Sequence, residues 1–212
     1  MLPLNAILNV GRHDRGMRVT TIKEKLLGCL EIALFMQRGS NRFSGDLGSM
    51  KKSFLIPVIL LPLTIAMILG AHPVDSLDAT SAQMLIAIYA LRLVIYLAGF
   101  LALVYAFAAK LDRMDDFYKF VTANNWLTIP AAALTAPLII MFLNGYYSWA
   151  EIYPLVVVIA LYSYGYTAFM AAQILRIPYE LACFIAIAGM AIHQTSLAVL
   201  KWAAVNTLMV IS

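Results

Sequence analysis

The chain has 212 residues, of which 63% are hydrophobic and only 12% are charged, and its formal net charge is +4 at pH 7. Soluble domains carry roughly twice this share of charged residues, so the composition excludes an ordinary soluble protein. The basic residues are dispersed among acidic ones, which argues against a nucleic-acid surface, and the length leaves no room for a large soluble catalytic domain beside several membrane spans.

The first part of the chain, residues 1–53, is predicted to be a cytoplasmic segment. Residues 1–10 are uncharged and are followed by a polar run, so we expect no cleaved signal peptide. Residues 20–38 have a helical, weakly amphipathic pattern, which predicts a helix lying along the inner membrane surface. The apolar face holds Ile22, Leu26, Leu30 and Ala33, and the polar face holds Glu24, Glu31 and Arg38.

A glycine-rich stretch covers residues 38–48. It lacks the fixed spacing and the lysine of a phosphate-binding loop, so it is interpreted as a flexible connector. Cys29 and Cys183 have no second cysteine or histidine at metal-ligand spacing. Both are expected to be reduced thiols, and neither a metal site nor a cofactor is predicted.

Five hydrophobic runs are long enough to cross a bilayer as α-helices. They predict an all-α integral membrane bundle over residues 54–212. The predicted spans are 54–71, 82–109, 122–143, 152–174 and 178–200. Pro57 and Pro62 in the first span, and Pro130 and Pro137 in the third, remove backbone donors and are expected to kink or interrupt these helices.

The basic residues predict the orientation of the bundle. Thirteen of the fifteen lie before the first span or in the connections that follow the second and fourth spans. Cytoplasmic connections of membrane proteins carry such an excess of lysine and arginine. The amino terminus is therefore expected in the cytoplasm and the carboxyl terminus on the opposite side.

Arg92 lies inside the second predicted span, where a cation is costly and normally faces protein or water. Tyr89 and Tyr96 share a helix face with it, three and four residues away. The second and fifth spans run in opposite directions, which is expected to bring His193 and Gln194 into the same half of the bilayer. These residues are expected to form one intramembrane polar cluster.

Polar side chains of the fourth span are expected to converge on this cluster: Tyr162, Ser163, Tyr164 and Tyr166. Glu151 is the expected carboxylate partner of Arg92. Two interpretations remain open for the cluster. In one, its hydrogen bonds only fix helix packing; in the other, it binds a ligand or relays protons.

The amphipathic lead and the five closely spaced spans resemble the Yip-type membrane-protein family, which is named for interaction with Ypt/Rab GTPases. The segments at 43–46, 52–55, 109–113 and 117–126 resemble a group of uncharacterised small membrane proteins of alphaproteobacteria. This resemblance implies a bacterial inner-membrane location, with a periplasmic carboxyl terminus, and supplies no mechanism. In that group the stretch ending in Asn-Trp looks like the signature, which makes Asn124, Asn125 and Trp126 a candidate interface motif.

The sequence contains no recognisable catalytic arrangement, so a nonenzymatic protein is predicted. The first hypothesis is an accessory, assembly or scaffold subunit of a larger membrane complex, with membrane lipids and other integral membrane subunits as partners. Small residues at helical spacing would allow close helix contacts: Ala98, Ala102 and Ala106, and also Ala168 and Ala172. The alternative is a small transporter or channel around Arg92 and His193. A third hypothesis, an intramembrane lipid-processing enzyme, has neither a nucleophile nor a metal set to support it.

Overall fold

The computed structural model describes residues 21–70 and 79–211. Within these ranges the chain consists of helices and short connections, and five stretches are long and apolar enough to cross a membrane. They are Leu47–Ile65, Ile86–Lys110, Met114–Leu143, Trp149–Leu175 and Tyr179–Leu200. The prediction of an all-α bundle with five membrane helices is confirmed. The expectation for the first ten residues, and the predicted span end at residue 71, lie outside the described residues.

The amino-terminal elements are α1 (Ile22–Ala33), the 3₁₀ helix η2 (Gln37–Arg42), α2 (Leu47–Ser53) and α3 (Leu55–Gly70). Thr21 begins α1 with a capping box, because its hydroxyl accepts from Glu24 N at 3.3 Å and the Glu24 carboxylate accepts from Thr21 N at 3.0 Å. Asp46 begins α2 by accepting from Ser49 N at 2.7 Å. Hydrogen bonds from Ser49, first from its backbone and then from its side chain, lower the pKa of Asp46 to about 2.

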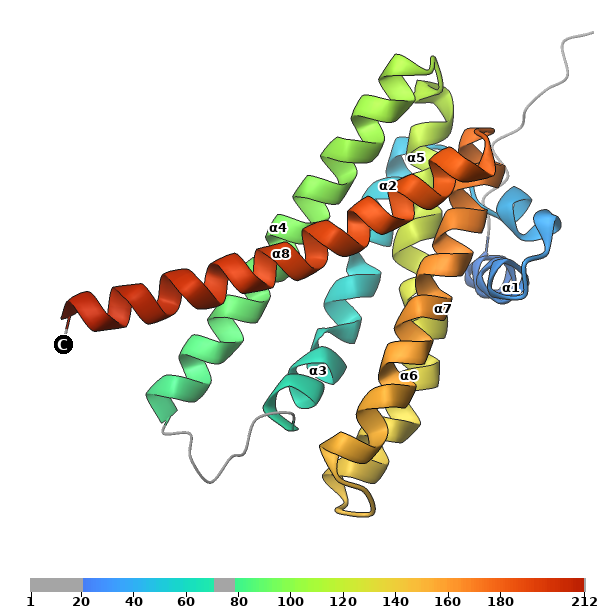
Figure 1. Ribbon diagram of the computed structural model, residues 1–212. Helices are drawn as coiled ribbons and strands as arrows, with labels where there is room; N and C mark the ends of the chain where they lie inside the picture. Colours follow the sequence, from blue (N-terminus) through green and yellow to red (C-terminus); the bar gives the residue numbers. More distant parts are fainter. Residues whose placement is uncertain (1–20, 71–78, 212) are drawn as a thin grey trace, which may run out of the picture.

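The remaining helices are α4 (Ala79–Lys110), α5 (Met114–Trp126), α6 (Thr128–Leu143), α7 (Trp149–Leu175) and α8 (Tyr179–Ile211). Figure 1 shows α4 and α8 crossing as one pair, while α3, α6 and α7 run together on the other side. The two groups are joined by the direct packing of α7 on α8 and by α5, which contacts α2, α4 and α7.

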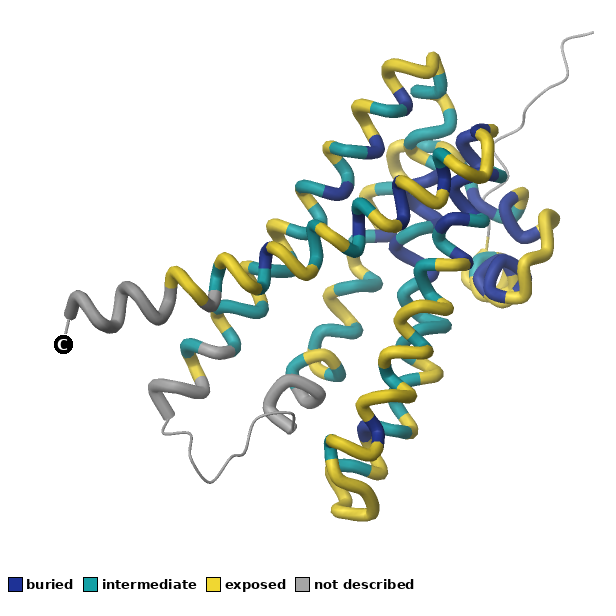
Figure 2. The backbone as a smooth tube through the Cα atoms, viewed as in Figure 1, coloured by how far each residue is buried: buried dark blue, intermediate teal, exposed yellow. Residues whose placement is uncertain are grey.

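Buried side chains gather at one end of the molecule, where α1, α5, the last turns of α7 and the first turns of α8 meet (Figure 2). This region is called the core end below. Phe120 of α5, Met170 of α7 and Ala182 of α8 are fully buried there. Towards the opposite end, most side chains of the spans are exposed or half-buried. Apolar surface of this kind suits contact with lipid or with other membrane helices.

The third span is interrupted near Pro130, as predicted. Helix α5 ends at Trp126 and α6 begins at Thr128, because Pro130 has no N–H to donate to the carbonyl of Trp126. Neighbouring carbonyls find side-chain donors. The Thr128 hydroxyl donates to Asn125 O at 2.6 Å, and the Tyr166 hydroxyl donates to Leu127 O at 3.1 Å.

Helices α4 and α8 cross at two glycines. A Cβ atom at Gly189 would lie 2.8 Å from the ring of Phe100, and a Cβ atom at Gly99 would lie 3.2 Å from Ile192. The absence of side chains at these positions lets the two helices approach closely. This crossing places the middle of α8 against the middle of α4.

The glycine-rich stretch is not a flexible connector, so that interpretation is wrong. Part of it forms η2, which packs against α1 through a close glycine contact: a Cβ atom at Gly39 would lie 2.8 Å from Gly28 O. Glu31 of α1 is 3% exposed and accepts two hydrogen bonds from Arg42, at 2.6 and 2.9 Å. Arg38 adds a third contact at 2.9 Å. The bidentate hydrogen bond from Arg42 is the first cause that lowers the pKa of Glu31.

The amphipathic helix forms over Ile22–Ala33, shorter than the predicted 20–38, so Arg38 lies in η2 instead. Two residues of the helix also lie on a different face from the one predicted. Ile22, Leu26 and Leu30 are 70%, 43% and 55% exposed, as expected for a face directed at the membrane surface. Glu31 and Ala33 are instead buried against the protein. Glu31 is drawn inward by the arginines near η2, and the Ala33 carbonyl accepts a hydrogen bond from the Tyr162 hydroxyl of α7.

Candidate functional site

The central polar contact inside the membrane region joins Arg92 of α4 to His193 of α8. Arg92 Nε donates to His193 O at 3.1 Å, and Arg92 Nη2 lies 2.9 Å from His193 Nδ1. Since a guanidinium only donates, Nδ1 is the acceptor, which requires the neutral imidazole with its proton on Nε2. One residue therefore fixes the guanidinium through two acceptors.

Two tyrosines extend this contact along α4. The ring centroid of Tyr89 lies 5.6 Å from Arg92 Cζ, which is a cation–π distance. The ring of Tyr96 meets the His193 ring edge-on, with centroids 5.1 Å apart, and stacks on Phe100 at 5.8 Å. Of the predicted stripe, Arg92 and Tyr96 therefore contact His193, and Tyr89 contacts Arg92.

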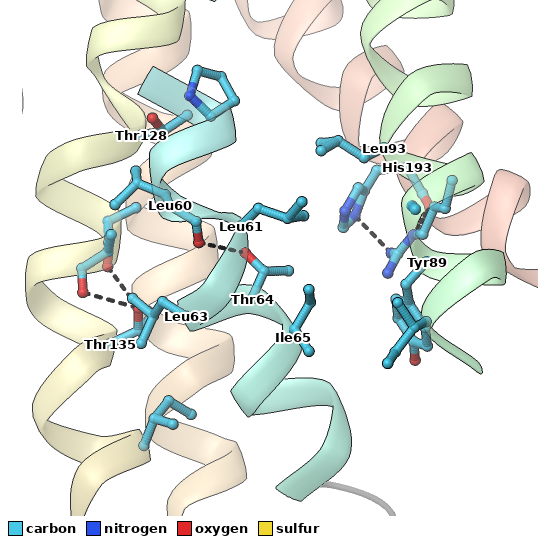
Figure 3. A pocket seen from close by; sticks show the side chains of 17 residues that line it. Leu60, Leu61, Leu63, Thr64, Ile65, Tyr89, Leu93, Thr128, Thr135 and His193 are labelled. Carbon is cyan, nitrogen blue, oxygen red and sulfur yellow. Dashed lines mark hydrogen bonds between the residues drawn. The ribbon is translucent and has the colours of Figure 1, made fainter. Parts of the chain in front are cut away.

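A cavity of about 300 Å³ lies beside Arg92 and His193, between α3 and α6 on one side and α4 on the other (Figure 3). Its walls are mostly aliphatic and include Leu60, Leu61 and Ile65 of α3. A second cavity of about 360 Å³ extends along α5, α6 and α7. The two cavities share Pro57, Leu93, Thr128, Ala131, Thr135 and His193, so they lie next to each other.

Several residues predicted for the cluster make other contacts. The hydroxyl of Tyr162 donates to Ala33 O and that of Tyr166 to Leu127 O, so these groups serve helix packing. Gln194 is exposed on α8. Glu151 lies in the first turn of α7, where its carboxylate accepts from Ser148 N at 2.7 Å, and its prediction as the partner of Arg92 is wrong. Within the described ranges no carboxylate forms an ion pair with Arg92.

The Asn124, Asn125 and Trp126 motif lies at the junction of α5 and α6. Asn125 is 0% exposed, and its Nδ2 donates to Ser53 Oγ at 2.9 Å, joining α5 to the end of α2. Its Oδ1 has no hydrogen-bond partner among the described residues. The ring of Trp126 lies 5.4 Å from Lys25 Nζ of α1. Asn124 is half-buried and lines the second cavity.

Two hydroxyl residues of the spans that line the cavities, Thr135 and Thr167, were not predicted for this region, whereas Ser163 was. Thr135, Ser163 and Thr167 line the cavities, and each donates to a carbonyl of its own helix, at 2.9, 2.8 and 2.8 Å respectively. Their presence within hydrophobic runs was visible in the sequence, but the helix face on which they lie was not. Because their protons are used within the helix, they offer a cavity occupant only acceptor lone pairs.

Chemically, the site supplies a fixed cation beside an apolar cavity. A guanidinium held in place can bind a carboxylate or phosphate with two parallel hydrogen bonds. The uncharged His193 and the two tyrosines leave its positive charge uncompensated within the described part of the chain. Comparison of the chain with protein-family models, with curated proteins and with solved structures found no match.

Proposed function

We propose that the protein is a nonenzymatic integral membrane protein that acts as an accessory, assembly or scaffold subunit of a larger membrane complex. Its partners are other integral membrane subunits and membrane lipids. The observation that carries this proposal is the outward face of α4, where Ala98, Ala102 and Ala106 are all exposed. The comparable alanines of α7, Ala168 and Ala172, are buried inside the protein.

The contrast between the two helices supports a contact with a partner. Small residues four apart let helix backbones approach closely, and α7 uses them for this purpose within the bundle. On α4 the pair formed with α8 lies on another face, at Gly99 and Phe100. The exposed alanine row is continuous with Leu91 and Ile95, which are also exposed. A second membrane helix fits such a face closely because no large side chain stands between the backbones.

Affinity capture after gentle solubilisation tests the proposal. The wild-type protein is expected to retain a defined partner in near-stoichiometric amount, identified by mass spectrometry. The double variant Ala98→Leu/Ala102→Leu is expected to lose this partner, because leucine separates the two backbones. Ala133→Leu is the matched control, since Ala133 is exposed on α6, away from this face. Recovery of the protein alone, or only as a homo-oligomer, contradicts the accessory role.

We also propose a bacterial inner-membrane location with a cytoplasmic amino terminus and a periplasmic carboxyl terminus. The distribution of the basic residues and the resemblance to small alphaproteobacterial membrane proteins of Yip type support it. Cysteine accessibility from the two sides of the membrane tests it. A cysteine introduced at Lys23, an exposed position of α1, is expected to react only with reagents that reach the cytoplasm.

A second candidate function is a small transporter or channel, favoured by the two adjoining cavities and by the interrupted third span. Anion flux in liposomes reconstituted with the purified protein tests it. Flux that is lost in Arg92→Ala favours transport, whereas an absence of flux in the wild-type protein rejects it.

A further inference from the structure

We propose that the cavity between α3, α4 and α6 binds an acyl amphiphile with an anionic headgroup, whose oxyanion pairs with Arg92. This site is separate from the exposed alanine face of α4, and binding there requires no transport. Different experiments therefore test the two proposals. The shared chemistry of the ligand is a carboxylate or phosphate joined to a hydrocarbon chain.

The charge of Arg92 calls for an anion. A cation within a membrane span is costly, and the cost falls when an opposite charge lies close to it. Among the described residues the contacts of Arg92 are with His193, which is neutral, and with the ring of Tyr89. Two of the five guanidinium N–H groups are used by His193. The remaining N–H groups of the guanidinium are free to donate hydrogen bonds to an oxyanion.

The position of Arg92 directs that oxyanion into the cavity. Its side chain lines the cavity together with His193. Figure 3 labels His193 and draws a dashed contact from its ring beside the cavity. His193 holds the guanidinium at both Nε and Nη2, so its plane is set before any ligand arrives. Preorganised donors of this kind bind a carboxylate or phosphate at low entropic cost.

The walls require an apolar body on the ligand. The α3 side is formed by Leu60, Leu61, Leu63 and Ile65, and the α4 side includes Ile86 and Leu93. Thr64 and Thr135 also line the cavity, but their hydroxyls donate to Leu60 O and Ala131 O of their own helices. A sugar or another polyhydroxy ligand would find few donors here. A hydrocarbon chain fits such walls through burial of apolar surface.

The arrangement of the helices gives a membrane amphiphile a route to the site. Helix α3 packs mainly on α6, and α4 packs mainly on α8, so the cavity occupies the seam between the two pairs. Its volume of about 300 Å³ is at the small end of ligand sites, which suits one chain and part of a headgroup rather than a whole two-chain lipid.

Native mass spectrometry of the purified full-length protein tests the proposal. The probes are oleate, phosphatidylglycerol, phosphatidylcholine, monoolein and inorganic phosphate. Wild-type protein is expected to bind oleate or phosphatidylglycerol at least tenfold more tightly than phosphatidylcholine or monoolein. Preference for oleate identifies a fatty-acid site, and preference for phosphatidylglycerol identifies a phospholipid site. Equal binding of charged and uncharged probes, or binding of inorganic phosphate as tight as that of the amphiphiles, overturns the proposal.

Two variants locate the binding. Arg92→Gln removes the charge and is expected to weaken oleate or phosphatidylglycerol binding at least tenfold, whereas Lys110→Gln removes a charge from the exposed end of α4 and is expected to change nothing. Ala132→Leu fills the cavity without altering Arg92 and is expected to block the same probes. If Ala132→Leu binds normally, the ligand lies elsewhere and the proposal fails, whatever the state of the Arg92 variant.

Discussion

Arg92 and His193 lie 101 positions apart in the chain and are joined by two contacts, Nε to His193 O at 3.1 Å and Nη2 to His193 Nδ1 at 2.9 Å. The pair connects α4 to α8 beyond their glycine crossing, towards the ends of the helices that lie away from the core end. It serves both interpretations of the polar cluster, since the contact that fixes helix packing also orients the guanidinium.

The contact between Arg92 and His193 is expected to be energetically coupled. A double-mutant cycle with Arg92→Met and His193→Phe is expected to give about 1–3 kcal/mol of coupling, because either single change leaves one half-buried partner unsatisfied. Thermal unfolding of the purified protein in detergent measures it. Tyr96→Phe, which keeps the ring stacked on Phe100, is the control and is expected to stay within about 0.5 kcal/mol. If the effects of the two substitutions on the free energy of unfolding simply add, the contact has no energetic role.

The carboxylate of Glu31 is expected to hold η2 on α1. Glu31→Gln removes the charge that Arg42 and Arg38 share, and should lower the free energy of unfolding by about 2 kcal/mol. This loss of unfolding free energy is smaller than the loss expected for a fully enclosed ion pair, because both arginines are partly or largely exposed. Arg38→Gln, at the more exposed arginine, is expected to cost less, and an equal cost for Arg38→Gln and Arg42→Gln would contradict this assignment.

The same carboxylate predicts a pH dependence. The pKa of Glu31 in the folded protein lies below its ordinary value of 4.5. Its ion pairs therefore add stability above pH 4.5, and that stability is lost as the pH falls through the lowered pKa. Asp46, with a pKa of about 2, behaves in the same way. Unfolding temperatures measured between neutral and acidic pH should fall less steeply for Glu31→Gln than for the wild type.

The close packing of η2 on α1 depends on glycine. Gly39→Ala would place its Cβ atom 2.8 Å from Gly28 O and 2.9 Å from Ile32. Backbone cannot move aside as a flexible side chain can, so we expect a loss of about 1–3 kcal/mol in stability. Gly45→Ala is the matched control, since its nearest neighbour would be Lys119 Cβ at 3.5 Å, an ordinary contact. Equal unfolding temperatures for the two variants would refute the packing argument.

Asn125 is expected to be structural, unlike its neighbour Asn124. Asn125→Ala removes the hydrogen bond to Ser53 and opens a space in a fully buried site, at a cost of about 2 kcal/mol. Asn124→Ala changes a half-buried side chain at the cavity wall and should leave the unfolding temperature within about one degree of wild type. Thermal unfolding of both variants measures the difference, and the reverse order would assign the structural role to Asn124.

The number of spans was predictable because hydropathy over about 20 residues reports directly on membrane helices. The first and third spans begin at Leu47 and Met114, before the predicted starts at residues 54 and 122. The break near Pro130 was predictable for a similarly local reason, the missing N–H of proline. The stripe of Tyr89, Arg92 and Tyr96 followed from helical spacing. His193 was placed near this stripe only through the opposite directions of the second and fifth spans.

The remaining contacts could not be predicted, because their partner groups do not stand out in the sequence. Tyr162 and Tyr166 donate to the backbone carbonyls of Ala33 and Leu127, and every residue carries such a carbonyl. The Glu151 carboxylate accepts a hydrogen bond from Ser148 N in the first turn of its own helix, so it does not pair with a distant cation. The folding of the glycine-rich stretch onto α1 depended on the long-range pairing of Glu31 with Arg42.

The proposed accessory role is tested most directly by photo-crosslinking in native membranes, with a photoreactive residue in place of Ala102 and, as a control, in place of Ala133. Both positions are exposed, on α4 and α6 respectively. We predict one discrete adduct with a different membrane protein from position 102 and none from position 133. Adducts with lipid only, adducts with a second copy of this chain, or the same products from both positions would contradict the proposal.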